Sequence, residues 1–142
     1  MIKAILFDLD GTLLDRHSSL IVYLNQHMIR CGTILNGIPP TEYLSKVIER
    51  DAHGHVSKDT VFRQIEKDFN LPEGSWEVLY RDFGNYFPDT CVPFPKMRQT
   101  LNHLAECGFL LGLITNGWST SQDPKIDGLG IRHYFRTVLV SG

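Results

Sequence analysis

The first fifteen residues constrain the fold more than any other part of the sequence. Residues 2–7 are apolar apart from Lys3, and they lead directly into Asp8 and Asp10, two residues apart. A short apolar run of this kind is typical of a strand covered on both faces, as in a parallel sheet. Two carboxylates at the end of a buried strand are costly unless a positive charge binds nearby, so the pattern indicates a cation site.

The rest of the chain alternates between helical and strand patterns. From about residue 17 to residue 87, apolar side chains recur at three- and four-residue spacing, which predicts amphipathic helices. Short apolar runs return at 109–114 and 134–140, and a helical pattern precedes each of them. The predicted helices span about 17–31, 40–52, 58–69, 76–87, 97–107 and 121–129.

This order of elements predicts an α/β fold. Strand, helix, strand, helix, strand is the signature of right-handed crossovers in a parallel sheet. The long helical block after the first strand then forms an insertion. The expected organisation is a core from 1–15 and 93–142, with a helical domain from 16–92.

Composition narrows the function classes. The formal net charge of −2 does not favour nucleic acid as a partner, because nucleic-acid binding calls for a basic surface. No apolar stretch approaches the roughly 18 residues that a membrane helix needs. The three cysteines are widely spaced and match neither a zinc pattern nor a disulfide framework. Reduced thiols and a cytoplasmic location are therefore expected.

Polar residues cluster where the first two strands end. Ligands of open α/β sheets bind outside the carboxyl ends of the strands, so two clusters on neighbouring strands should converge there. The candidate residues are Asp8, Asp10 and Thr12 after the first strand, and Thr115, Asn116 and Gly117 after the second.

These residue types suit phosphate chemistry with a divalent cation. One carboxylate can act as a nucleophile and the other as an acid and base, while a cation neutralises both. Thr115, with the backbone N–H groups of Asn116 and Gly117, is suited to hold phosphate oxygens. Asp8 and Asp10 are the predicted metal ligands.

Two stretches resemble a known superfamily. FDLDGTLLD is similar to the first motif of the haloacid dehalogenase (HAD) superfamily, and LGLITNG resembles its second motif. The resemblance covers the whole chain. It implies a Rossmann-like parallel sheet core, of which three strands are present, with an α-helical cap inserted after the first motif.

The resemblance also implies roles for individual residues. Asp8 matches the nucleophile that becomes an aspartyl-phosphate, and Asp10 matches the residue that protonates the leaving group and then activates water. The Asp8 carboxylate and the Asp10 backbone carbonyl match the Mg²⁺ ligands, and Thr115 matches the residue that binds the phosphoryl group. The implied activity is a magnesium-dependent phosphatase acting on a small phosphorylated metabolite. An acid at Asp10 favours phosphate-ester hydrolysis over carbon–halogen cleavage, while phosphomutase activity stays open.

Simpler interpretations exist for several of these residues. Asp-Gly is common in turns, and the Asp8–Gly11 stretch also resembles the start of a calcium loop, although Leu13 and Ser19 occupy positions where that loop needs glycine and glutamate. Thr12 fits a helix cap equally well. Lys125 fits either a substitute phosphate-binding lysine or, more simply, a solvated helix residue.

The remaining two superfamily motifs, a lysine and an acidic pair, are not found in these residues. We therefore expect either a fragment of a longer protein or a form completed by a partner. A non-catalytic phosphate- or metal-binding module is the alternative function. The first strand would be an uncovered sheet edge, which favours self-association.

The sequence alone yields one prediction about activity. The isolated 142-residue chain should show little phosphatase activity, because its magnesium site is incomplete. A colorimetric phosphate-release assay with excess MgCl₂ measures this. Robust magnesium-dependent turnover by this polypeptide alone would contradict the expectation.

Overall fold

The computed structural model describes all of residues 1–142, which separate into two compact units. One, the core unit, comprises Met1–Ser19 and Pro88–Gly142, and the other, the helical unit, comprises Leu20–Phe87. No helix has both the length and the apolar character needed to cross a membrane. The strands are β1 (Ala4–Phe7), β2 (Leu110–Asn116) and β3 (Thr137–Ser141). The α-helices are α1 (Arg16–Arg30), α2 (Pro40–Asp51), α3 (Lys58–Asp68), α4 (Ser75–Tyr86), α5 (Met97–Glu106) and α6 (Ser119–Leu129).

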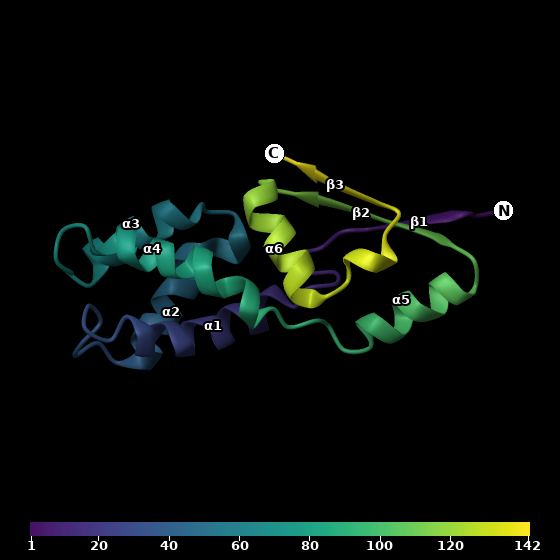
Figure 1. Cartoon of the computed structure of the whole chain (residues 1–142). Coiled ribbons are helices and arrows are strands. Elements are labelled where there is room, and N and C mark those ends of the chain that lie inside the picture. Colours follow the sequence, from purple (N-terminus) through teal and green to yellow (C-terminus); the bar gives the residue numbers. More distant parts are fainter. The chain divides into compact units, whose positions relative to one another are not determined.

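The core unit contains a three-stranded sheet in the order β1-β2-β3, and every pairing is parallel (Figure 1). Phe7 pairs with Leu113, and Leu113 pairs in turn with Val138. This register aligns the carboxyl ends of β1 and β2, which places their polar residues at one edge of the sheet. The predicted α/β class with a parallel sheet is confirmed.

Helices α5 and α6 pack on the same face of this sheet (Figure 1). Both crossovers step in the same direction, from β1 to β2 and from β2 to β3, so right-handed connections place both helices on one side. Leu111 and Leu113 of β2 belong to a buried cluster with Leu101 of α5 and Ile126 of α6. This cluster is the hydrophobic core of the unit.

The opposite face of the sheet is exposed, which corrects the prediction of strands covered on both faces. Leu6 is 65% exposed, Ile114 41% and Leu139 54%, and all three point away from α5 and α6. The apolar composition of the strands predicted a sheet with helices on both faces. The connections from β1 to β2 and from β2 to β3 instead place α5 and α6 on the same face.

Element boundaries also differ from the prediction, mainly at the site. Strand β2 extends through Thr115 and Asn116 because both pair with β3. Helix α6 begins at Ser119, two residues earlier than predicted, because the Trp118 carbonyl accepts the amides of the first turn. A 3₁₀ turn at Arg132–Tyr134 replaces the predicted start of the third strand.

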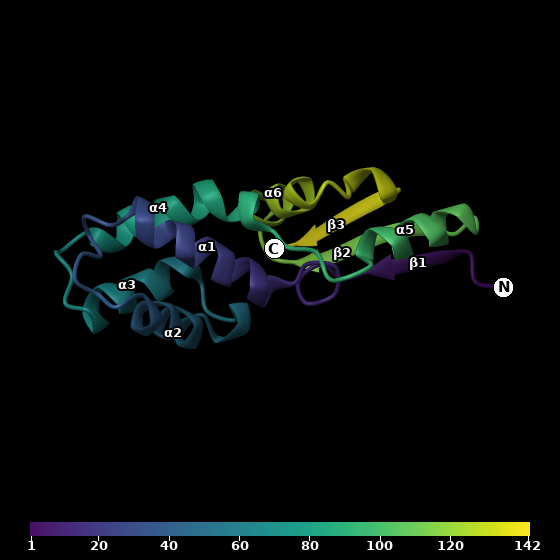
Figure 2. The same cartoon turned by 90° about the horizontal axis from the view of Figure 1, so that it is seen from below.

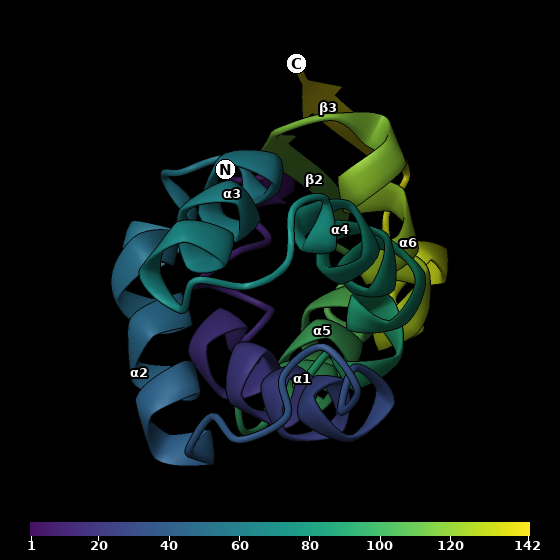
Figure 3. The same ribbon diagram turned by 90° about the vertical axis from the view of Figure 1, so that its left-hand side faces the viewer.

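The helical unit is built from α1 to α4 (Figures 2 and 3). Helix α2 packs against α3, and α3 packs against α4. Each of α2, α3 and α4 carries one apolar stripe, as the three- and four-residue spacing predicted. The fully buried large side chains of this unit are Tyr23, Tyr43, Phe62, Phe87, Leu24, Ile65 and Leu79.

A polar network around Asp82 lies within this apolar interior. Arg30 donates to both oxygens of the Asp82 carboxylate, at 2.8 and 2.9 Å. The Tyr23 hydroxyl donates to Asp82 Oδ2 at 2.9 Å, and His27 Nδ1 lies 2.7 Å from the same oxygen. His27 Nε2 lies 2.9 Å from the Tyr43 hydroxyl. The network therefore joins α1, α2 and α4 through hydrogen bonds.

The electrostatics of this network follow from burial and charge. Burial raises the pKa of the Asp82 carboxyl, but hydrogen bonds from Arg30, His27 and Tyr23 outweigh it and bring the pKa down to about 2. Burial lowers the pKa of His27 despite the opposing effect of Asp82. A neutral His27 that donates from Nδ1 to Asp82 and accepts at Nε2 from Tyr43 satisfies every group.

Removing the Asp82 charge should destabilise the helical unit. Asp82→Asn removes the charge of a carboxylate that is only 9% exposed, and it takes the ion-pair partner from Arg30 and weakens the bonds from His27 and Tyr23. We expect a loss of about 3 kcal/mol in the free energy of unfolding. The matched control is Asp68→Asn, whose partner Arg50 is 34% exposed, with an expected loss below about 1 kcal/mol. Urea unfolding followed by circular dichroism at pH 7 measures both. Equal losses in the two variants would contradict the proposed importance of the network.

Candidate active site

The loop that follows β1 is anchored by Leu9. This side chain is fully buried between the two acidic residues, and its backbone carbonyl accepts the amides of Thr12, Leu13 and Leu14 at 3.0 to 3.2 Å. Gly11 adopts a φ of +81°, a conformation that side-chain-bearing residues avoid. The chain therefore turns sharply at the strand end, so Asp8 and Asp10 need not share the face that an extended strand would give them.

The returning chain at residues 92–94 holds this loop in place. The Asp15 amide donates to the Val92 carbonyl at 2.8 Å, and the Phe94 amide donates to the Leu13 carbonyl at 3.0 Å. The loop is consequently fixed on both sides, by β1 and by the segment that leads into α5. A fixed backbone is what a site needs if its carboxylates are to keep a defined geometry.

Asp10 is the more constrained of the two acids. Lys125 Nζ lies 3.2 Å from Asp10 Oδ1 and 3.3 Å from Oδ2, and Gln122 Nε2 donates to Oδ2 at 2.9 Å. The Lys125 side chain is only 11% exposed. The interpretation of Lys125 as a solvated helix residue is therefore wrong. Helix α6 starts right after β2 and packs its inner face on the sheet, which brings Lys125 to the end of β1.

Gln122 joins the two strand ends and was not singled out from the sequence. Its Nε2 carries two protons, which Asp10 Oδ2, Thr115 Oγ1 at 2.6 Å and the Asn116 carbonyl at 2.9 Å share as acceptors. Its Oε1 accepts from Lys125 Nζ at 2.7 Å. A weak sequence signal existed. Gln122 and Lys125 are three residues apart, so they share one face of a helix that begins at the candidate site.

Asp8 and Thr115 differ in their surroundings. Asp8 follows directly after β1 and is exposed, whereas Thr115 lies in β2 and is 2% exposed. Thr115 Oγ1 already accepts a hydrogen bond from Gln122, so its own hydroxyl proton can be donated to a ligand oxygen. Thr12 is exposed on the loop between Asp10 and Leu14.

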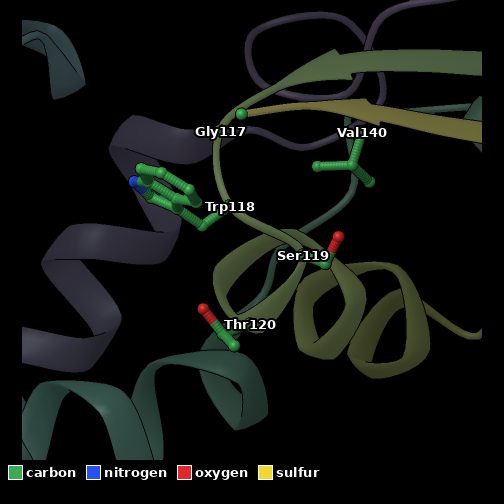
Figure 4. Close-up of a pocket in the computed structure, with 6 residues that line it drawn as sticks. Gly117, Trp118, Ser119, Thr120 and Val140 are labelled. Atoms are coloured by element: carbon green, nitrogen blue, oxygen red, sulfur yellow. The ribbon is translucent and has the colours of Figure 1, made fainter.

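Asn116 and Gly117 are hydrogen-bonded to Ser141 at the end of β3. The Gly117 amide donates to the Ser141 carbonyl at 3.0 Å, and Asn116 Oδ1 accepts from the Ser141 hydroxyl at 2.7 Å. The predicted use of the Gly117 N–H for phosphate would require the first of these bonds to break. A hollow of about 190 Å³ lies beside this turn, lined in part by Gly117, Trp118 and Ser119 (Figure 4), and neither Asp8 nor Asp10 borders it.

Cys91 is a weak nucleophile candidate although it lies near this site. Burial raises the pKa of its thiol to about 11, with Lys125 opposing the shift and Asp10 adding to it. The thiol is therefore protonated at neutral pH, which makes it a poor nucleophile.

The oxygen donors after β1 fit a hard divalent cation. The Asp8 carboxylate is exposed, and the Asp10 backbone carbonyl accepts none of the hydrogen bonds that close the loop. Carboxylate and carbonyl oxygens without sulfur or nitrogen donors match the preference of Mg²⁺. In the helical unit, His27, Cys31 and Asp82 place their ligand atoms within 4.8 Å of one another, but Asp82 is already occupied by Arg30.

The family model of haloacid dehalogenase-like hydrolases matches residues 5–142, almost the whole chain. The chain belongs to this family. Membership confirms the resemblance drawn from the two motifs and agrees with the parallel sheet and the inserted helices.

Curated relatives are phosphatases by name. A phosphoglycolate phosphatase of Agrobacterium fabrum is 30% identical over 94% of this chain and 56% of its own length. A glyceraldehyde 3-phosphate phosphatase of Methanopyrus kandleri is 32% identical over 99% of this chain and 62% of its own length. The chain thus spans roughly three fifths of the length of the curated relatives that it matches.

Solved structures share the fold at lower identity. The HAD hydrolase YfnB of Bacillus subtilis, determined bound to magnesium, aligns with a TM-score of 0.69 at 18% identity and covers 98% of this chain and 63% of its own. A protein from Haemophilus somnus, described as a predicted phosphoglycolate phosphatase, aligns with a TM-score of 0.60 at 24% identity. The alignment covers 98% of this chain and 62% of that protein's chain.

The turn at Gly11 gives a testable stability prediction. Gly11→Ala meets no atom within 4 Å but must hold a φ of +81°, so we expect a loss of about 1 kcal/mol. Gly84→Ala in α4 also meets open space but in a helical conformation, so it should gain about 0.5 kcal/mol. Thermal unfolding of both variants measures the difference. The same sign for both changes would contradict the conformational argument.

Proposed function

We propose that this chain is part of a magnesium-dependent phosphatase in which Asp8 is the nucleophile and Asp10 the acid and base. One observation carries the proposal. At the ends of β1 and β2, an exposed carboxylate stands two residues from a second carboxylate that Lys125 and Gln122 hold, and Gln122 also binds Thr115. Family membership and the names of the curated relatives support the same reaction class.

The proposed reaction has two steps. An Asp8 carboxylate oxygen attacks phosphorus, the ester P–O bond breaks, and Asp10 gives a proton to the departing alkoxide. A water molecule then attacks phosphorus in the aspartyl-phosphate while Asp10 takes its proton, which releases phosphate and restores the Asp8 carboxylate. The Thr115 hydroxyl donates to an oxygen of the phosphoryl group in both steps.

Magnesium is proposed as the cofactor. The Asp8 carboxylate and the Asp10 backbone carbonyl would hold it, and when bound it would supply positive charge that offsets the phosphate and the nucleophile. The donor chemistry of the loop supports this, and one structural neighbour of the same fold was determined bound to magnesium.

The proposed substrate is a small phosphate monoester. The names of the curated relatives refer to phosphoglycolate and glyceraldehyde 3-phosphate, both small organic phosphates. We propose that the segment 16–92 serves as a cap domain of such an enzyme, with 1–15 and 93–142 contributing its catalytic core.

Asp8→Asn in the full-length gene product tests the proposal. The variant should lose at least about 10³-fold in kcat on a phosphate monoester, because an amide cannot form the aspartyl-phosphate. Asp127→Asn is the matched control, since Asp127 is an exposed acid of the same unit paired with Arg132, and it should retain normal turnover. EDTA should abolish wild-type activity and added MgCl₂ should restore it. Retained turnover in Asp8→Asn would overturn the assignment of the nucleophile.

A further inference from the structure

We infer that Gln122 and Lys125 are positioning residues that fix the Asp10 carboxylate relative to Thr115, and so align proton transfer with the bound phosphoryl group. This inference rests on the proposed function, because it concerns the proton-transfer step of that reaction. Neither residue lies in the two sequence motifs that identify the family, and both come from α6.

The hydrogen bonds of Gln122 define a bridge between the strands. A single amide nitrogen lies 2.9 Å from Asp10 Oδ2 after β1 and 2.6 Å from Thr115 Oγ1 in β2. These two oxygens belong to residues 105 positions apart in the chain. Because the same nitrogen contacts both, a movement of the Asp10 side chain relative to Thr115 must break or stretch at least one of the bonds.

Lys125 fixes the orientation of Gln122 as well as contacting Asp10. Its ammonium donates to Gln122 Oε1 at 2.7 Å, which keeps the amide nitrogen turned toward Asp10 and Thr115. A flipped amide would present its nitrogen to the ammonium and its oxygen to the carboxylate, both unfavourable. The longer contacts from Lys125 to both Asp10 oxygens, at 3.2 and 3.3 Å, add a second restraint.

Burial makes these restraints effective. Gln122 as a whole residue is 2% exposed and the Lys125 side chain 11%, so water competes little for their polar atoms. Glycine at position 117 lets Gln122 approach the turn, because a Cβ there would stand 3.3 Å from Gln122 Cγ. Burying the polar side chains of Gln122 and Lys125 is costly unless they are hydrogen-bonded to fixed partners. Here the partners include Asp10 and Thr115, and both belong to the candidate site.

Two other roles for this pair make different predictions. If Lys125 bound the phosphoryl group directly, its loss would impair every phosphate ester alike and raise KM. If the pair only stabilised the fold, its loss would lower stability without distinguishing between substrates. A positioning role predicts a kcat effect that depends on whether the leaving group needs a proton.

The experiment compares two substrates in the full-length gene product. 2-Phosphoglycolate releases an alkoxide that needs protonation, whereas 4-nitrophenyl phosphate releases a phenolate that leaves without it. Rapid-quench measurement of leaving-group release in the first turnover isolates the step in which Asp10 acts as an acid. We expect Gln122→Leu and Lys125→Met each to lower this rate about 100-fold for 2-phosphoglycolate and less than about 3-fold for 4-nitrophenyl phosphate.

Three controls make the outcome decisive. Lys3→Met removes an exposed lysine of the same unit and should leave both rates unchanged. Lys125→Arg keeps a cation and should recover at least about a third of the lost rate. If Lys125→Met fails to fold, Lys125→Arg takes its place as the test variant. Circular dichroism verifies the fold of each variant.

Equal losses on both substrates, a rise in KM with unchanged kcat, or no loss at all would overturn the positioning role. These outcomes differ from failure of the proposed function, which would appear as an absence of magnesium-dependent turnover in the wild type or as full activity in Asp8→Asn.

Discussion

Parallel pairing of β1 with β2 is the constraint on which the rest of the core depends. It aligns Phe7 with Leu113, so Asp8 and Asp10 after β1 lie at the same edge of the sheet as Thr115 at the end of β2. Hydrogen bonds of the ladder and apolar contacts to α5 and α6 hold this register. A slip of one residue would exchange Leu113 with Ile114 between the covered and the exposed face, and would carry Thr115 away from Gln122.

A carboxylate is held by a cation and neutral donors in both units. Asp10 in the core unit is held by Lys125 and Gln122, and Asp82 in the helical unit is held by Arg30 with its neighbours. In each case a cation and neutral donors together hold a carboxylate, whose side chain is 9% exposed for Asp82 and 27% exposed for Asp10. The difference lies in what surrounds them. The Asp82 network is closed among helices, whereas Asp10 stands beside the exposed Asp8, on a loop that a ligand can reach.

Much of the architecture was predictable because it follows from local patterns. Apolar runs before Asp8 and Thr115 indicated strands, the alternation with helices indicated a parallel sheet, and the two motifs indicated the family that the comparison then confirmed. The expectation of strands covered on both faces was wrong, since apolar composition cannot reveal which side the crossovers supply with helices. Lys125 was misjudged for a related reason, because a lysine in a polar stretch gives no local sign of being buried.

The sequence by itself determined the strands, the helices, the acidic turn after β1 and the family to which the chain belongs. The strands, the helices and the turn follow from hydrophobic periodicity and local sterics, whereas the family was recognised from the resemblance of two short motifs. Only the tertiary structure decided that Gln122 links Asp10 to Thr115 and that Lys125 is buried against both Asp10 and Gln122. The contacts to Asp10 join positions 112 and 115 residues apart, and the geometry of the whole group exists only once β1, β2 and α6 have packed together.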